Sequence, residues 1–406
     1  MERVAIIGAG AAGCFCAAWL RSLAPGMSVT LFEAGPRPMA KLAITGGGRC
    51  NLTNSFEGIR SLSEAYPRGE RVMKRALKTF SQEDAIRWFT ARGVPCMLQE
   101  DHCWFPASQD AMDIVRCLLR SMQGVDLRLG RRVQSIEMAG QAGQDGQTGY
   151  LVDGASFDAV VVTSGGAPGG LPFLGSMGLE LVPPVPSLFT FTVPDPSLRS
   201  LMGLVVQASI GLSGTAFKAS GPLLITDWGL SGPAALKLSS YAARHLAASG
   251  YQGTLAVNWL DANEGQTRAM LQEMASAHPQ KQLTSTPPAR LPGRLWEHVL
   301  AKAGLRDGIR WAELGSKGLN RLTATLCNDT YPLAGKSRFR EEFVTAGGVA
   351  LSNIDLGTLE CKRHPGLYFA GEVLDIDAIT GGFNLQAAWS TGYVCAHSVA
   401  ARNIGK

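Results

Sequence analysis

The sequence predicts an α/β fold in which a Rossmann-type domain is split by an insertion that holds a small β-barrel and a helical segment. A short apolar run at residues 4–7 leads into a glycine-rich turn, and a second apolar run follows at residues 29–32, which is the pattern of a βαβ unit. A proline cluster at residues 182–186 ends the α/β pattern, which returns near Phe343. Between these points, apolar and polar residues first alternate in short stretches separated by glycines, which is typical of strands. The pattern then becomes helical. The expected domains are the split domain at 1–186 and 346–406, an inserted β-rich domain at 187–260, and an inserted basic helical domain at 261–345.

The bulk composition indicates a soluble protein with ample material for more than one core. The chain has 406 residues, of which 46% are hydrophobic and 17% are charged. This composition is ordinary for a globular chain of two or three domains. Because no apolar run reaches the length of a membrane span, we expect a cytoplasmic protein with no membrane partner. The sequence does not indicate the oligomeric state.

The cysteines and histidines argue against disulfides and against a metal site. The nine cysteines are scattered, odd in number and contain no CxxC pair, and the six histidines do not cluster. This usage is typical of a reducing compartment rather than of a disulfide framework or a zinc site. We therefore expect no metal.

The first glycine-rich turn has the spacing of a dinucleotide fingerprint. Gly8 permits a tight turn, Gly10 lets the backbone approach a pyrophosphate, and Gly13 lets the next helix pack closely on the strand. The N-terminus of that helix offers free N–H groups to phosphates. Glu33 ends the second apolar run and is placed to accept hydrogen bonds from the adenosine ribose. The expected contacts of this unit are Gly8, Ala9, Gly10, Ala11, Ala12, Gly13, Glu33 and Ala34. The fingerprint alone does not separate FAD from NAD.

A second glycine-rich motif, KLAITGGGRCNLTN, covers residues 41–54. Three consecutive glycines weaken a helix or strand, and their usual purpose is a positive-φ path or a close approach of backbone to a ligand. The donors and amides around them suit a flavin ring edge or ribityl chain, and the alternative is a flexible polar loop. The expected cofactor contacts here are Lys41, Gly47, Gly48, Arg49, Asn51, Thr53 and Asn54.

The middle of the split domain continues the α/β pattern. Residues 71–92 and 110–122 have helical apolar spacing, and residues 133–136 and 150–152 are expected to form a hairpin. Residues 157–163 form a buried strand that leads into glycines 165, 166, 169 and 170. Ligands bind at the carboxyl ends of strands in doubly wound sheets. The expected cofactor contacts of this region are Val133, Thr163, Gly165 and Gly166.

The C-terminal segment favours FAD over NAD. A buried strand at residues 367–370 runs into Gly371 and Glu372, and a carboxylate there can bind ribityl hydroxyls. Residues 381–386 (GGFNLQ) then open a helix whose N-terminus would point at the flavin pyrimidine edge. FAD is long enough to be held from both ends of the chain. The competing interpretation of the glycine pair is a plain structural helix cap. The expected contacts are Gly371, Glu372, Gly381, Gly382, Asn384 and Leu385.

These motifs carry a family resemblance. GAGAAG at 8–13, Glu33 and KLAITGGGRCNLTN resemble the BaiN-like or ribosomal-RNA dihydrouridine synthase family of FAD-dependent flavoproteins. Further similarity lies at Phe105-Pro106 and at residues 163–170, 229–239, 344–349 and 366–392, so that it spans nearly the whole chain. The chain resembles a divergent branch, because relatives commonly have His where this chain has Asp227, and LECK and GGFNLQAAWS depart from MESK and GGYNLQWAWS.

The resemblance implies an FAD-dependent NAD(P)H oxidoreductase that reduces a conjugated C=C through flavin N5. One implied substrate is uridine in large-subunit ribosomal RNA, and the other is a small steroid-like enone. Only one complete fingerprint is present, so NAD(P)H is expected to bind transiently. A flavin monooxygenase or oxidase and a non-catalytic flavin- and RNA-binding assembly factor are the remaining alternatives.

A reduction of this kind also needs a proton donor. Cys50 is the first candidate for this catalytic role, because it lies within the ring-side motif and because the cation of Arg49 could lower its pKa. A buried packing cysteine is the competing interpretation. Asp227, Asp375 and Asp377 are weaker candidates.

The insertion carries the excess positive charge of the chain. Residues 187–345 contain 16 Lys and Arg against 11 Asp and Glu, which accounts for the net charge of +5. Such an excess is consistent with a polyanionic partner, and ribosomal RNA is the expected one. A solvated helical surface is the alternative.

Overall fold

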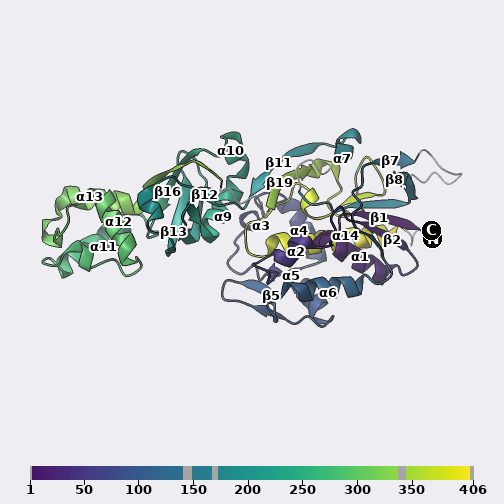
Figure 1. Ribbon diagram of the computed structural model, residues 1–406, viewed down its shortest axis with the longest axis horizontal. Helices are drawn as coiled ribbons and strands as arrows, with labels where there is room; N and C mark the ends of the chain where they lie inside the picture. The colour runs from purple at the N-terminus through teal and green to yellow at the C-terminus, as the bar shows by residue number, and fades with distance from the viewer. Residues whose placement is uncertain (1, 140–148, 167–171, 337–343, 403–406) are drawn as a thin grey trace. The chain divides into compact units, whose positions relative to one another are not determined.

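The computed structural model describes residues 2–139, 149–166, 172–336 and 344–402 (Figure 1). The chain divides into two compact units. The split unit comprises residues 1–185 and 344–406, and the inserted unit comprises residues 186–343. The last two glycines of the 163–170 motif and the turn of the expected hairpin lie outside the described residues.

The split unit is built on a five-stranded parallel sheet with strand order β20-β10-β1-β2-β6. Ile7 at the end of β1 is in register with Phe32 on one side and with Val162 on the other, so three strands end at one edge of the sheet. The inner strands are almost entirely buried apolar runs, as is typical of a parallel sheet covered on both faces, whereas β6 at the edge carries exposed Asp126 and Arg128. Their bounds are β1 Arg3–Ile7, β2 Ser28–Phe32, β6 Asp126–Arg128, β10 Ala159–Val162 and β20 Leu367–Phe369.

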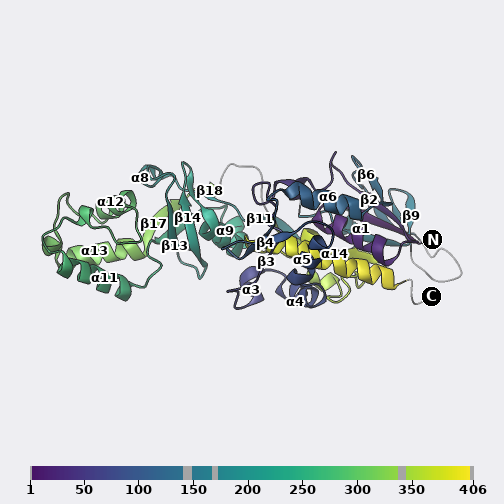
Figure 2. The same cartoon turned by 90° about the horizontal axis from the view of Figure 1, so that it is seen from below.

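Two long helices from opposite ends of the chain pack on each other. Helix α1 (Ala11–Leu23) and helix α14 (Phe383–Ala401) lie side by side in both views (Figures 1 and 2). A Cβ on Gly392 would stand 2.8 Å from the carbonyl oxygen of Ala12, so the helices approach closely where that glycine lies. Around them lies an aromatic core that includes Phe15, Phe80, Trp88, Phe89 and Trp389.

The helical pattern at residues 71–92 forms two helices rather than one. Helix α4 (Glu70–Thr79) ends before Phe80, and α5 (Gln82–Thr90) begins at a capping box made by Ser81 and Asp84. The reciprocal bonds of that box satisfy the first free N–H groups of α5, so the chain restarts a helix there.

Smaller elements complete the split unit. Ile136 pairs with Val152 as expected for the hairpin, whose first strand begins three residues later than Val133. The remaining elements are α2 Ala40–Ile44, α3 Leu62–Ala65, α6 Ala111–Ser121, α7 Pro172–Ser176, β3 Thr53–Asn54, β4 Cys96–Leu98, β5 Cys103–Pro106, β7 Ile136–Ala139, β8 Gly149–Val152, β9 Ala155–Phe157, β11 Leu181–Ser187, β19 Val344–Val349, η3 Leu351–Asn353 and η4 Gly371–Val373.

The inserted unit contains a seven-stranded antiparallel sheet with strand order β17-β16-β13-β14-β15-β12-β18. Its two edge strands are consecutive in the chain, because Ala334 alone separates β17 from β18. The two edges must therefore come together, which curls the sheet toward a barrel. The strands are β12 Phe191–Thr192, β13 Val205–Leu212, β14 Lys218–Ile225, β15 Gly229–Ser231, β16 Gly253–Asn258, β17 Asp329–Leu333 and β18 Gly335–Lys336.

A helical part follows β16 and returns the chain to β17. Its core includes Trp296 and Trp311, which are stacked and nearly inaccessible to solvent. The helices of the inserted unit are α8 Pro196–Arg199, α9 Gly232–Tyr241, α10 Ala243–Ala248, α11 Glu264–Ala277, η1 Leu283–Ser285, α12 Gly293–Lys302, η2 Trp311–Glu313 and α13 Gly315–Cys327. None of the helices in the described part of the chain is long and apolar enough to cross a membrane.

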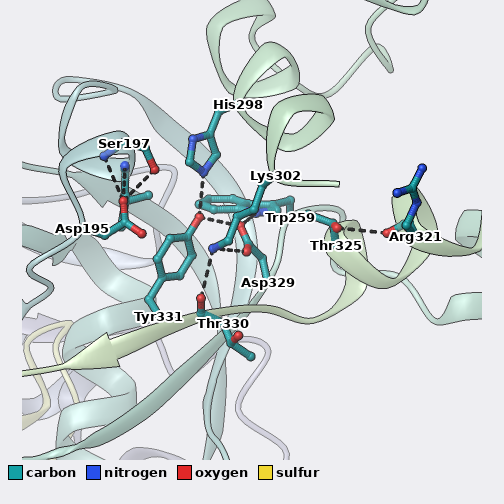
Figure 3. A network of polar contacts seen from close by, with 11 residues as sticks. Asp195, Ser197, Trp259, His298, Lys302, Arg321, Thr325, Asp329, Thr330 and Tyr331 are labelled. Carbon is teal, nitrogen blue, oxygen red and sulfur yellow. Dashed lines mark hydrogen bonds and ion pairs between the residues drawn. The ribbon is translucent and has the colours of Figure 1, made fainter. Parts of the chain in front are cut away.

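A buried polar network joins α12 to β17 in the inserted unit (Figure 3). The carboxylate of Asp329 is 2% exposed; it accepts a hydrogen bond from Trp259 Nε1 at 2.9 Å and one from the Tyr331 hydroxyl. Its second oxygen pairs with Lys302 Nζ, which also donates to the carbonyl of Thr330. Each oxygen of this buried carboxylate therefore has a partner.

Candidate flavin site

The fingerprint turn is held against strand β10 by very close contacts. A Cβ on Gly13 would lie 2.0 Å from the carbonyl oxygen of Gly8 and 2.5 Å from Thr163 Oγ1. Thr163 Oγ1 donates to the carbonyl of Gly8 at 2.7 Å and lies 3.1 Å from that of Ile7. The turn, the start of α1 and the end of β10 thus form one compact structure in which only glycine fits at positions 8 and 13.

The start of α1 offers donors to an anion. Its N-cap residue, Gly10, has no side chain to satisfy the first N–H groups, and a Cβ there would meet nothing within 4 Å. Unsatisfied N–H groups and the helix dipole together favour a phosphate at this position. Ala11 and Ala12 provide the first turn of the helix without bulky side chains.

Glu33 is tied to the same turn. Its carboxylate accepts from Ala9 N at 2.9 Å and from Gly35 N at 2.7 Å. A carboxylate has about four lone-pair positions, so acceptor capacity is left for ribose hydroxyls. Ala34 is exposed beside it.

Three expected residues from distant parts of the chain, Lys41, Gly165 and Gly166, lie around Glu372. Its carboxylate accepts from Thr345 N at 2.8 Å and lies 3.7 Å from Lys41 Nζ. Cβ atoms built on Gly165 and Gly166 would lie 3.7 Å and 3.1 Å from its oxygens. Gly371, just before it, has φ +75°, and a Cβ there would stand 2.9 Å from the Cβ of Ala12 in α1. The C-terminal Gly-Glu turn and the N-terminal fingerprint therefore face the same place.

The ring-side motif and the C-terminal glycine pair are also in direct contact. Asn54 Nδ2 donates to the carbonyl of Gly381 at 2.9 Å. A Cβ on Gly382 would lie 2.5 Å from the carbonyl oxygen of Thr53. With its amide oriented to satisfy both neighbours, Asn51 donates to Thr53 O at 3.1 Å and accepts from Gly382 N at 3.2 Å. Gly382 is the N-cap of α14 and has no side-chain cap, which leaves the first N–H groups of that helix available.

The remaining expected residues behave differently. Asn384 is engaged with its own loop, because its amide accepts from Ala378 N at 2.9 Å and donates to Ala378 O at 3.0 Å. Leu385 is partly exposed in the first turn of α14. Gly47 and Gly48 have positive φ and open space around them. Val133 is 7% exposed, and no described contact joins it to the other expected residues.

Arg49 does not lower the pKa of Cys50, contrary to the expectation from the sequence. The guanidinium of Arg49 lies over the ring of Phe105, 4.6 Å from its centroid. Cys50 is completely buried, and burial together with the nearby thiol of Cys96 raises the pKa of Cys50 well above its ordinary value. The thiol is therefore protonated at neutral pH.

Sequence reasoning missed a clamp on the C-terminal loop. Arg68 and Asp377 form a two-pronged ion pair in which the arginine side chain is 11% exposed and the aspartate is 0% exposed. Nearby, Ile379 N donates to Ala65 O at 2.9 Å and the Tyr66 hydroxyl donates to Phe383 O at 2.9 Å. The segment before α4 thus fixes the loop that presents Gly381 and Gly382. No spacing rule could have revealed a pair 309 residues apart.

Arg68→Lys should destabilise this loop by about 1.5 kcal/mol, because lysine keeps the charge but loses one of two charge-assisted bonds. Hydrogen exchange of residues 374–384 measures the effect, which should appear as faster exchange in this loop. Arg87→Lys is the matched control, since the pair of Arg87 with Asp84 is exposed and should contribute less than about 0.5 kcal/mol. Equal protection of the loop in wild type and Arg68→Lys would exclude the clamp.

The arrangement defines a class of protein: an FAD-dependent oxidoreductase with a Rossmann-type domain. Both ends of the chain supply glycine turns, free helix N-termini and carboxylates to one edge of the parallel sheet. The chain belongs to the HI0933-like protein Rossmann domain family, whose model matches residues 2–398.

Curated relatives cover almost the whole chain. The chain is 32% identical to the ribosomal RNA dihydrouridine synthase of Escherichia coli (strain K12), over 99% of each protein. It is 30% identical to the protein of that name from Haemophilus influenzae, over 97% of each. It is 28% identical to the 3-dehydro-bile acid delta(4,6)-reductase of Clostridium scindens, over 99% of this chain and 100% of that one.

Among solved structures, the 3-ketosteroid delta1-dehydrogenase of Sterolibacterium denitrificans superposes with a TM-score of 0.50. The match covers 99% of this chain and 100% of that one, at 13% sequence identity. At that identity the likeness shows the shared fold alone.

Proposed function

We propose that this protein reduces uridine to dihydrouridine in large-subunit ribosomal RNA, with NAD(P)H as a transient reductant. The observation that carries the proposal is the end-to-end similarity to two ribosomal RNA dihydrouridine synthases, at 32% and 30% identity. Bound FAD would supply hydride transfer. The residues that would hold it are those around Gly8, Glu33, Glu372 and Gly382 described above.

The structure supports RNA binding by the inserted unit less strongly than the sequence does, because several of its basic side chains already have partners within the unit. Lys302 is paired with the buried Asp329, and Arg306 Nη2 is bonded to Glu313 at 2.6 Å. Arg310 is bonded to the neutral amide of Gln280. The exposed Lys317 and Arg321 on α13, together with the exposed Arg310, whose bonded amide is neutral, are therefore the better candidates for phosphate contacts from this unit.

Mass spectrometry of ribosomal RNA nucleosides from cells with and without the gene tests the proposal. The deletion strain should lack a dihydrouridine that returns when the gene is restored. Unchanged dihydrouridine in the deletion strain would exclude this function.

A second candidate is reduction of a small steroid-like enone. The observation that favours it is the 28% identity to the bile acid reductase over the full length. Turnover of a conjugated steroid ketone by the purified protein, together with unaltered ribosomal RNA in the deletion strain, would select it.

Cys50 is the proposed proton donor for either reduction. The ordinary pKa of a cysteine thiol is 9.0, and the pKa of Cys50 is raised above it, so the thiol stays protonated up to pH 9.0. The protonated thiol is the form that a general acid requires. The thiol of Cys50 is completely buried in the structure. Cys50→Ala should lower the rate of product formation about 100-fold with FAD retained. Because the pKa is raised, the Cys50-dependent rate should not fall as pH approaches 9.0.

Cys96→Ala is the matched control for Cys50, since Cys96 lies beside it on β4 and is half-buried. Its turnover should equal that of wild type. Wild-type turnover in Cys50→Ala would show that Cys50 is a packing residue.

A further inference from the structure

Arg49 is held flat on the surface of the split unit. Its guanidinium lies 4.6 Å from the centre of the Phe105 ring, and that ring is 2% exposed. Arg49 Nε donates to the carbonyl of Gly46 at 3.2 Å, and Nη1 lies 3.5 Å from Gln109 Oε1. One face of the guanidinium is therefore covered by a fixed aromatic ring, while the residue as a whole is exposed.

Gln109 is itself fixed, so the orientation of Arg49 is specified. The Gln109 amide accepts from Gln99 Nε2 at 3.0 Å and donates to the carbonyl of Pro106 at 3.1 Å. A long side chain loses rotamer freedom when it is held in this way, and that loss would otherwise occur on ligand binding. The arginine is preorganised.

The positive charge of Arg49 is not neutralised within the described residues. Its polar partners there are the carbonyl of Gly46 and the amide of Gln109, which are both neutral. The expected FAD contacts Gly8, Glu33, Asn54, Glu372 and Gly382 make their described contacts with residues other than Arg49. The cation is thus held in place without a described anionic partner.

Open space lies beside the cation. Gly47 has φ +70° and Gly48 has φ +83°, and Cβ atoms on either would meet nothing within 4 Å. Met97 is 42% exposed, and its sulfur lies 3.4 Å from Gln109 Nε2. A flat cation, bare backbone and a flexible apolar side chain therefore form one continuous surface.

We propose that the guanidinium of Arg49 is a platform on which a base of single-stranded RNA stacks, beside the loop that leads to Asn51 and Asn54. This inference rests on the proposed function and names the residue that recognises its substrate. Proteins bind unpaired RNA bases by stacking them on aromatic rings or on guanidinium planes, and the charge also attracts the adjoining phosphate. The buried Phe105 supports the plane from behind, and the exposed Met97, which contacts Gln109, offers an apolar side chain nearby.

The purified FAD-loaded protein and fluorescein-labelled oligouridylate test the platform by fluorescence anisotropy. Arg49→Met should weaken RNA binding about tenfold, since stacking and charge are both lost. The slope of log affinity against log salt should fall by about one. Arg49→Lys keeps the charge but not the plane, so it should keep the salt slope and still bind more weakly than wild type. The FAD content of each variant is measured in parallel, and RNA affinity is compared only between FAD-loaded proteins, because Arg49 is also an expected FAD contact.

Arg87→Met is the matched control, because it removes an exposed arginine of α5 that is paired with Asp84. It should bind oligouridylate like wild type. Wild-type RNA affinity in Arg49→Met would overturn the platform, and so would a loss of FAD affinity with unchanged RNA affinity in the loaded protein.

Complementation separates this inference from the proposed function. If the deletion strain keeps its dihydrouridine, the proposed function fails. If the wild-type gene restores dihydrouridine and Arg49→Met restores it equally at limiting expression, the function stands and the platform alone fails.

Discussion

Replacing Asp329 with alanine should lower the free energy of unfolding of the inserted unit by about 3–5 kcal/mol. The substitution leaves Lys302 as a partly buried cation without its carboxylate and removes the acceptor of Trp259 Nε1 and the Tyr331 hydroxyl. Burial and the neighbouring Asp329 raise the pKa of Tyr331, so its hydroxyl stays protonated and donates to that carboxylate. His298 Nε2, 2.9 Å away, must then donate to the tyrosine oxygen.

Hydrogen exchange of strands β16 and β17 in the full-length protein measures this loss of stability. Protection of both strands should fall in Asp329→Ala, while the parallel sheet of the split unit keeps its protection. Asp307→Ala is the control, because Asp307 is exposed on the turn after α12 and its removal should change stability by less than about 0.5 kcal/mol. Unaltered protection in Asp329→Ala would mean that the apolar core alone holds α12 on the sheet.

The parts of the fold that the sequence predicts are those with local periodic signals. The first βαβ unit and the buried strand at Ala159–Val162 have apolar runs that lead into glycine-rich turns, and the final helix begins directly after a pair of glycines. The break in the pattern at residues 71–92 was missed because Phe80, which follows the last residue of α4, fits the apolar spacing of a single helix. Only the cap formed by Ser81 and Asp84 ends one helix and starts the next.

In the candidate site, too, the residues with a local sequence signal were predicted, and those that depend on distant neighbours were not. Glycines at positions 8, 13 and 382 were recognised because fixed spacing gives them a purpose, and the close contacts around them agree with that purpose. The orientation of Arg49 and the pair of Arg68 with Asp377 depend on tertiary neighbours that no spacing reveals. The sequence left open whether Cys50 is buried, since a cysteine in a polar motif has no sequence signal for the direction of its thiol, and the structure shows that it is buried.

Gly8 lies where the expected cofactor site meets the sheet, and the backbone there leaves room for glycine alone. Its φ is +107°, and a Cβ there would lie 2.5 Å from the carbonyl oxygen of Thr163 and 2.8 Å from Ser164 Cα. Both atoms belong to the backbone that continues strand β10, so they cannot move aside as a flexible side chain would. A substitution therefore combines a strained backbone conformation with overpacking.

Gly8→Ala should reduce FAD affinity about 1000-fold, because strain and overpacking together cost about 2–6 kcal/mol and displace the turn from the pyrophosphate. Flavin fluorescence titration of the apoprotein measures the dissociation constant, and absorbance measures the FAD content of protein purified from cells. Gly154→Ala is the matched control, because Gly154 has φ +80° but open space around it. That control should lose only about 1–2 kcal/mol of stability from the left-handed conformation and should bind FAD normally. Full FAD content in Gly8→Ala would contradict the assignment of this turn as the phosphate cradle, since a displaced backbone cannot present the same N–H groups to the same anion.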